Sequence, residues 1–479
     1  MEIGFIFGVP LLGGITLAML GQKAWASALN SFFSFLLLVA TAFLVLRFVK
    51  HGPFSAFGDQ FFIDSLNIFL IALTSLVAFT TSLFSGTYMR REKEEGRLTP
   101  GSLHLYHSMF QIFVLTMVIA LSSNNLGILW VSMEAATLST VLLVSLYRTK
   151  AGFGAAWNYF ILCSVGISQA LFGTILLYFS AAQVAGPDEH GILWTHLESI
   201  KGSLPPSVVS LAFIFLLVGY GAKAGIVPLH NWLPDAHAEG PTPVSALLSG
   251  LLLNVALYAI LRVKILVDGA LRSNFAGNLM MAFGLLSVVV AAFFLLRQKS
   301  LKRLFAYSSI EHVGLMTFAF GLGGVGSMAG LLHMTTHTLA KSAAFFAAGE
   351  VIQKAHTQTM GDIRGVIRQI PGVGWGLMFA CLLLAGIPPS GIFLSEFMIL
   401  GLSVRQAAWT LPFMLVGLGV GFAAIAWKTQ EMAFGEAEAT SVSFSAPLVW
   451  IHLVLAILLG FYIPPYLLHW YREAAKLLG

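Results

Sequence analysis

The chain has 479 residues, of which 57% are hydrophobic and only 10% are charged. An average soluble domain carries about 25% charged residues, so the composition excludes a water-soluble globule. The formal net charge is +5, but the basic residues are spread over short loops, so they report membrane topology and do not form a surface for nucleic acid. We expect one integral membrane domain over residues 1–479, with the lipid bilayer around it.

A helix that crosses a bilayer needs about 20 mostly apolar residues. Windows of this kind predict an all-α polytopic membrane protein with about 14 transmembrane helices. They cover residues 3–20, 27–49, 62–85, 105–122, 124–146, 153–182, 207–226, 243–262, 275–296, 305–322, 327–350, 373–400, 409–433 and 445–467. The first window lacks a basic stretch before it, so it is interpreted as a retained helix and not as a signal peptide.

An even number of spans places both termini on one side of the membrane. The loops after the odd-numbered segments hold more lysine and arginine than those after the even-numbered ones, where Arg262 and Lys264 are counted. Cytoplasmic loops are the ones enriched in basic residues. The sequence therefore predicts a multi-pass protein of the cell inner (cytoplasmic) membrane with both termini on the outer side.

Helix-breaking residues interrupt the seventh and the twelfth segments. They are Gly219, Gly221, Gly225 and Pro228 in the seventh, and Gly386, Pro388, Pro389 and Gly391 in the twelfth. Interrupted segments at matching places in two halves of a transporter point to an ion site at unwound backbone, although ordinary kinks are the alternative. The two segments are five apart, so a repeat of five helices would insert with inverted topology.

The candidate functional charges inside predicted segments are Glu134, Lys223, Lys341 and Glu396. Each costs about 2.5–3.5 kcal/mol at the centre of a spanning helix, so we expect them to serve a function. Glu134 lies near the middle of its segment, and Lys223 lies beside the glycines of the seventh. They form a plausible proton-exchanging pair. The alternatives are a static salt bridge and a protonated, hydrogen-bonded carboxyl.

His333, His337 and Lys341 are spaced four residues apart and therefore share one helical face, which extends over about 12 Å. Imidazole titrates near physiological pH, so this face, with His312 on the preceding segment, is interpreted as a proton relay. A polar packing face is one alternative. A metal site is another, but no third ligand is convincingly placed.

Other motifs give no evidence for a cofactor. The run from Gly321 to Gly326 matches a dinucleotide fingerprint literally, but it joins two spanning segments with no strand before it, so it is interpreted as a tight loop. Cys163 and Cys381 lie far apart in apolar runs and indicate no cluster, zinc site or disulfide. We expect no cofactor, no metal and no redox chemistry in this chain, so any redox chemistry belongs to a partner.

Longer runs resemble a known family. They are residues 221–237 (GAKAGIVPLHNWLPDAH), 241–249 (PTPVSALLS), 130–134, 303–314 (RLFAYSSIEHVG) and 386–397 (GIPPSGIFLSEF). These runs are similar to the antiporter-like membrane subunits of respiratory complex I, of multisubunit cation/proton antiporters and of group 4 membrane-bound hydrogenases. The run 254–262 and the chain length look most like component F of the hydrogenase-4 group.

The resemblance implies two inverted five-helix repeats, at about 105–262 and about 275–433, with flanking helices at 3–85 and 445–467. Each repeat would carry half a proton channel, joined by charged residues at mid-membrane. The implied proton pathway consists of Glu134, Lys223, His230, Asn254, His312, His333, His337, Lys341 and Glu396. Asn254 departs from the pattern, because many members have a lysine there and asparagine cannot hold a proton.

The sequence thus favours a proton-translocating, non-redox subunit of a complex I-like or hydrogenase/formate hydrogenlyase-like respiratory complex. Its expected partners are other membrane subunits and a peripheral hydrogenase or dehydrogenase arm. Two alternatives stay open. One is a subunit of a multisubunit sodium/proton antiporter or inorganic-carbon uptake complex, and the other is a structural membrane anchor that conducts no ions.

Overall fold

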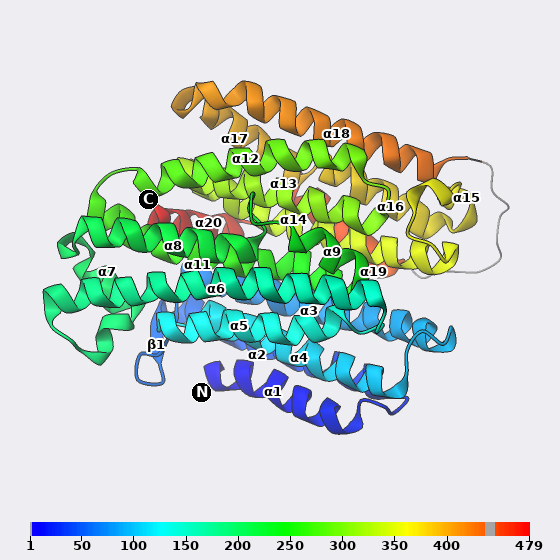
Figure 1. Ribbon diagram of the computed structural model, residues 1–479, viewed down its shortest axis with the longest axis horizontal. Coiled ribbons are helices and arrows are strands. Elements are labelled where there is room, and N and C mark those ends of the chain that lie inside the picture. Colours follow the sequence, from blue (N-terminus) through cyan, green and yellow to red (C-terminus); the bar gives the residue numbers. More distant parts are fainter. Residues whose placement is uncertain (1, 436–445) are drawn as a thin grey trace.

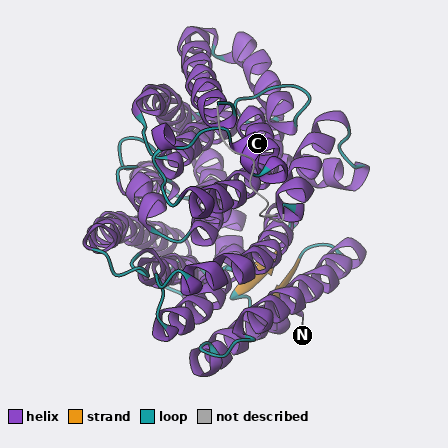
Figure 2. Cartoon of the chain, turned by 90° about the vertical axis from the view of Figure 1, so that its right-hand side faces the viewer, coloured by secondary structure: helices purple, strands orange, loops and turns teal. Residues whose placement is uncertain are grey.

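The computed structural model describes residues 2–435 and 446–479. Most helices run along the longest axis of the molecule (Figure 1), so a view turned by 90° shows many of them nearly end-on (Figure 2). The first helix begins and the last helix ends toward the same end of this bundle. The strands β1 (Phe54–Ala56) and β2 (Phe61–Ile63) form one antiparallel hairpin.

The first half of the chain contains α1 (Glu2–Leu20), α2 (Ala26–His51), α3 (Ser65–Glu94), α4 (Pro100–Ser122), α5 (Leu126–Val144), α6 (Lys150–Ala185), α7 (Trp194–Ile200), α8 (Pro206–Ala224) and α9 (Trp232–Glu239). The second half contains α10 (Thr242–Leu247), α11 (Leu253–Leu271), α12 (Phe275–Arg297), α13 (Leu301–Leu322), α14 (Val325–Ala355), α15 (Val366–Gln369), α16 (Pro371–Leu384), α17 (Gly391–Gln406), α18 (Leu411–Ala433), α19 (Pro447–Phe461) and α20 (Pro465–Leu478).

Ten helices of the described residues are long and apolar enough to cross a membrane, or eleven if the pair α19–α20, bent by 74°, counts as one span. The prediction of a polytopic all-α membrane protein is therefore confirmed at ten to eleven spans. The other predicted segments correspond to α13, α14 and the pair α16–α17. Helices α13 and α14 carry buried histidines and charges, because a helix enclosed by protein need not be apolar.

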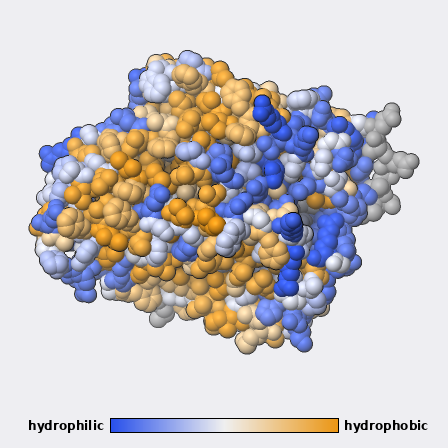
Figure 3. Space-filling view, in the orientation of Figure 1, coloured by the Kyte–Doolittle hydropathy of each residue, from blue (hydrophilic) through white to orange (hydrophobic). Residues whose placement is uncertain are grey.

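The outer surface is apolar where lipid would contact it. Figure 3 shows hydrophobic side chains across much of one face, with hydrophilic ones gathered toward its two ends. Large exposed apolar side chains include Trp157 and Phe172 on α6 and Phe413 on α18. Helix α14, in contrast, is buried along nearly its whole length. The core of the molecule thus lies around α14, and the covering helices face the bilayer.

Both segments with predicted breakers are interrupted. Helix α8 ends at Ala224, where Gly225 takes a left-handed conformation with φ of 75°, and α9 begins only at Trp232. Helix α16 ends at Leu384, Gly386 has φ of 72°, and Ser390 then caps α17. Glycine suits both positions because it adopts positive φ without steric cost.

The eighth predicted segment needs a correction. It was expected to end at residue 262, but α10, a π-helical turn (Leu248–Leu252) and α11 run on to Leu271. Arg262 and Lys264 are therefore buried helix residues, and their assignment to an outer loop is wrong. Both side chains have hydrogen-bond acceptors: Arg262 pairs with the buried Asp64, and Lys264 donates to the partly exposed Asp268 and to the carbonyl of Leu478.

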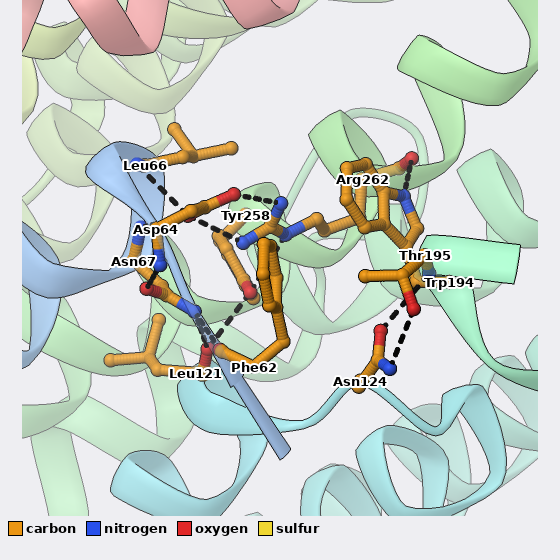
Figure 4. Close-up of polar contacts among 10 residues, drawn as sticks. All are labelled: Phe62, Asp64, Leu66, Asn67, Leu121, Asn124, Trp194, Thr195, Tyr258 and Arg262. Carbon is orange, nitrogen blue, oxygen red and sulfur yellow. Dashed lines mark hydrogen bonds and ion pairs between the residues drawn. The ribbon is translucent and has the colours of Figure 1, made fainter. Parts of the chain in front are cut away.

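A buried polar cluster ties the first helices to α11 (Figure 4). The two guanidinium NH₂ groups of Arg262 donate to the two carboxylate oxygens of Asp64 at 2.6 and 2.8 Å. Asp64 also caps α3 by accepting from the backbone N–H groups of Leu66 and Asn67. Arg262 further donates to the Tyr258 hydroxyl, which donates to the carbonyl of Leu121 in α4. The Asp64–Arg262 ion pair therefore joins α3 to α11, and the Tyr258 hydroxyl extends the link to α4.

Removing one partner of a buried ion pair leaves the other charge uncompensated, at a typical cost of about 3–5 kcal/mol. We expect Arg262→Met to lower the midpoint of thermal unfolding in detergent and the yield of assembled protein. Arg297→Ala, which removes an exposed arginine from the end of α12, is the matched control. Equal midpoints for the two variants would show that the Asp64–Arg262 pair contributes no net stability.

Candidate functional site

Lys223 lies in the last turn of α8, at the break, and its side chain is fully buried. Its ammonium donates to the hydroxyls of Thr137 (2.6 Å) and Tyr159 (2.9 Å). It also lies 4.9 Å from the centre of the Tyr159 ring. The carbonyl end of a helix carries a partial negative charge, which favours a cation at this position.

Glu134 on α5 reaches the same hydroxyl from the other side. Thr137 donates to one Glu134 carboxylate oxygen at 3.4 Å, and Ser164 on α6 donates to the other at 2.8 Å. The predicted Glu134–Lys223 pair is thus brought together through Thr137 and not by a direct ion pair between the two described side chains. Glu134 is half-buried, whereas Lys223 is enclosed. A proton could pass between them along the chain carboxylate–hydroxyl–ammonium.

A second cluster lies at the other break. The imidazoles of His312 and His333 share a hydrogen bond of 3.0 Å. The other ring nitrogen of His312 is 3.1 Å from the carbonyl of Leu384, the last residue of α16. His333 pairs with the hydroxyl of Ser395 on α17 at 2.8 Å. The two histidines therefore connect both edges of the interrupted helix.

His337 and Lys341 continue this cluster along α14. The His337 ring lies 5.1 Å from that of His312 and 6.4 Å from that of His333, between centroids. Both its ring nitrogens are buried without a hydrogen-bond partner among the described residues. The Lys341 ammonium donates to the carbonyl of Phe305 at 2.9 Å. His333, His337 and Lys341 thus share one buried face, as predicted from their spacing.

Asn254 follows the π-helical turn and faces α14. Its amide nitrogen donates to the carbonyl of Gly250 and to the hydroxyl of Thr338, each at 2.8 Å. Its amide oxygen is buried and has no partner among the described residues. Thr338 lies one residue after His337 and three before Lys341, so Asn254 borders the histidine–lysine face.

Two carboxyl groups lie near the break between α16 and α17. A Cβ atom at Gly386 would lie 2.2 Å from Oε2 of Glu396, so the glycine makes room for this carboxylate. Glu311, on α13 beside His312, is 3% exposed and interacts electrostatically with Glu396 and Lys341. Glu311 was absent from the predicted pathway, although the sequence placed it next to a pathway histidine.

His230 lies apart from both clusters, in the loop between α8 and α9. Its ring packs against those of Phe294 and Tyr307, with centroids 6.3 and 6.2 Å away. Both its ring nitrogens are buried and unpartnered in the described part of the chain. The structure therefore groups the other predicted residues into two clusters and leaves this one outside them.

Sequence reasoning also missed the hydroxyl groups that connect the charges. They are Thr137, Tyr159, Ser164, Thr338 and Ser395. Thr137 lies three residues after Glu134 and so shares its helical face. This spacing alone could have predicted the contact between them. Tyr159 and Ser164 come from α6, and only the packing of that helix brings them to Glu134 and Lys223.

No group of three or more His, Cys, Asp or Glu side chains that could hold a metal ion is found over residues 2–435 and 446–479. Cys163 and Cys381 are buried free thiols. The run Gly321–Gly326 spans the end of α13, the turn and the start of α14.

The arrangement can hold and pass protons between buried groups, and the fold and site together define an antiporter-like membrane subunit.

Comparison with known proteins gives the family. The model described as NADH:quinone oxidoreductase/Mrp antiporter, TM matches residues 123–422. The chain is 47% identical over 482 residues to a hydrogenase-4 component F homolog from Methylacidiphilum infernorum, and the match covers all of both chains. The protein therefore belongs to the transmembrane family of NADH:quinone oxidoreductase and Mrp antiporter subunits, and its resemblance to hydrogenase-4 component F is confirmed.

Two solved structures share the fold. A chain of the membrane-bound sulfane sulfur reductase, an archaeal respiratory membrane complex, has a TM-score of 0.90 at 23% identity, over 100% of this chain and 98% of that one. A chain of respiratory complex I from Thermus thermophilus has a TM-score of 0.74 at 26% identity, over 96% and 97%. Such relatives are subunits of multisubunit membrane complexes.

Proposed function

We propose that this chain is the proton-translocating, non-redox subunit of a hydrogenase-4-like or formate hydrogenlyase-like respiratory complex. The observation that supports the proposal is the presence of buried ionisable groups at both helix breaks and in the central helix α14. Lys223 lies at the first break and His312 at the second, with Lys341 and His337 in the central helix α14. Groups that cost free energy in a membrane are retained where they form ion pathways.

The pathway residues have separate tasks in this proposal. Glu134 and Lys223 exchange a proton through Thr137 in the first half. Asn254 orients water beside α14. The histidines and Lys341 pass the proton to the second half, where Glu396 ends the path. His230 is proposed as a further residue of the proton pathway, located in the loop after α8 and outside the two clusters.

The finer architecture belongs to the same proposal. We infer fourteen spans: the eleven that are long and apolar enough, counting α19–α20 as one, and in addition α13, α14 and the pair α16–α17. The inverted repeats lie at about 105–262 and about 275–433. The two similar breaks, each with a glycine at positive φ, support this repeat. Both termini are proposed on the outer side, because the basic excess persists once Arg262 and Lys264 are removed from the outer loops.

The relative's name suggests the partners. The M. infernorum protein is described as a component F homolog of hydrogenase-4. A chain that matches it over its full length would bind other membrane subunits and a peripheral arm that carries the redox cofactors. Copurification of soluble subunits with this chain, followed by their identification, tests this assignment directly.

The function is tested with the intact complex in sealed vesicles. Turnover by the peripheral arm should move protons across the membrane, and a protonophore should abolish the gradient. Redox turnover without ion movement would show a structural anchor instead. A gradient that a sodium ionophore collapses and a protonophore does not would show sodium as the translocated ion and would contradict the proposal.

His337 provides a test of the relay in α14. We expect His337→Ala to lower proton flux on the order of 10²-fold, the usual contribution of a positioned proton donor or acceptor, without loss of any bound metal. Metal analysis of the purified subunit is the accompanying measurement. Finding a stoichiometric metal that disappears in His337→Ala would replace the relay with a ligand site.

A further inference from the structure

Glu311 is a buried carboxyl group that the proposed pathway does not yet use. It lies on α13 and is 3% exposed. Its carboxylate packs against α18 at a glycine: a Cβ atom at Gly421 would lie 2.3 Å from one oxygen and 2.7 Å from the other. Gly421 thus leaves space for this carboxylate, which a side chain at that position would displace.

The neighbours of Glu311 are charged on two sides. Lys341 on α14 interacts electrostatically with Glu311 as an opposite charge. Glu396 on α17 interacts with Glu311 as a like charge. The adjacent residue on α13, His312, contacts the unwound backbone after α16. The charges of the central lysine and of the terminal glutamate of the pathway therefore both act on Glu311.

The charges of these three groups do not balance, because there are two carboxylates and one ammonium. If all three groups were ionised, one negative charge would remain uncompensated in a region of low dielectric constant. Neighbouring carboxyls avoid this by sharing one proton, so that only one of them is ionised at a time. A proton shared in this way can move from one carboxyl to the other without a net change in buried charge.

We propose that Glu311 carries protons between Lys341 and Glu396, an inference that rests on the proposed proton-translocating function. In the first step an N–H bond of the Lys341 ammonium breaks and an O–H bond forms on the Glu311 carboxylate. In the second step the O–H bond on Glu311 breaks and an O–H bond forms on the carboxylate of Glu396, directly or by relay through one water. No atom changes its oxidation state.

The first test compares Glu311→Gln with Glu350→Gln in the intact complex, reconstituted in vesicles. Glutamine keeps the size of the side chain but cannot carry a proton. Glu350 is another buried acid, located near the end of α14 and paired with Arg91. We expect proton flux to fall on the order of 10²-fold in Glu311→Gln and to stay near wild type in Glu350→Gln.

A second pair of variants moves the carboxylate without removing it. Gly421→Ala places a methyl group where the Glu311 oxygens lie, and a flexible side-chain end can yield without disturbing the helices. Gly419→Ala, two residues earlier in α18, adds its methyl group to open space. We expect about a tenfold lower flux in Gly421→Ala and no change in Gly419→Ala. Equal fluxes in the two variants would contradict the placement of Glu311 in the path.

Infrared difference spectroscopy separates a carrier from a static counter-ion. A carrier gains and loses a proton during turnover, so the C=O stretching band of a protonated carboxyl should change, and this change should be absent in Glu311→Gln. An unchanged band would identify a static partner of Lys341 and overturn the inference. If wild type moves protons, Lys223→Ala does not, and Glu311→Gln pumps normally, only this inference fails; if wild type moves none, the proposed function fails.

Discussion

Lys223→Ala and Glu134→Gln should each abolish proton translocation while the complex still assembles. The lysine is buried and, among the described residues, donates to two hydroxyls, so its ammonium can give up a proton without breaking a direct ion pair. Glutamine at position 134 still accepts from Ser164 but cannot bind the proton. We expect proton flux to fall on the order of 10²-fold or more in both variants, measured with a pH-sensitive dye in vesicles.

Thr137→Val tests the bridge between the two groups. Valine has nearly the same shape as threonine but lacks the hydroxyl that contacts both Lys223 and Glu134. Flux should therefore fall although both charges remain. Cys163→Ala removes a buried neighbouring thiol and is the control, with flux expected near wild type. Correctly assembled Lys223→Ala that pumps at the wild-type rate would show that this pair is structural.

The sequence was informative about segments that face lipid. Apolar windows located α1, α2, α6, α12 and α18, which are less than half buried, because lipid contact requires apolar side chains on much of their surface. The windows also located α3, α4, α5 and α8, which are at least half buried but equally apolar. Helix-breaking residues likewise located the two breaks. The windows were least reliable where protein encloses the helix. There α11 continues past Arg262, since a partner from α3 compensates the charge.

The residues of the candidate site likewise fall into those that the sequence predicted and those that only the structure revealed. Buried ionisable residues stand out in an apolar sequence, so Lys223, Lys341 and the α14 histidines were found without any structure. Tyr159 and Ser395 could not be found, because hydroxyl groups are common in membrane helices and gain importance only through the helix that packs against them. Glu311 was omitted although it is a charged residue directly before His312, which was included.

Asn254→Leu should stop proton conduction. The asparagine occupies a place where many relatives are expected to have lysine, and it holds α14 through Thr338 and its own helix through Gly250. Its remaining amide oxygen can accept a hydrogen bond from water next to His337 and Lys341. Leucine removes both the acceptor and the link to Thr338, so the path between the two halves of the subunit would become dry.

The matched substitution is Asn254→Lys. An ammonium at this position can donate to the same two acceptors, the Gly250 carbonyl and the Thr338 hydroxyl, so we expect it to retain conduction. Moving one proton against 100 mV takes about 2.3 kcal/mol, so a broken path should appear as lost coupling while redox turnover continues. The measurement is proton uptake per turnover in vesicles. Unchanged uptake in Asn254→Leu would mean that protons bypass α11, and that this position has no role in the pathway.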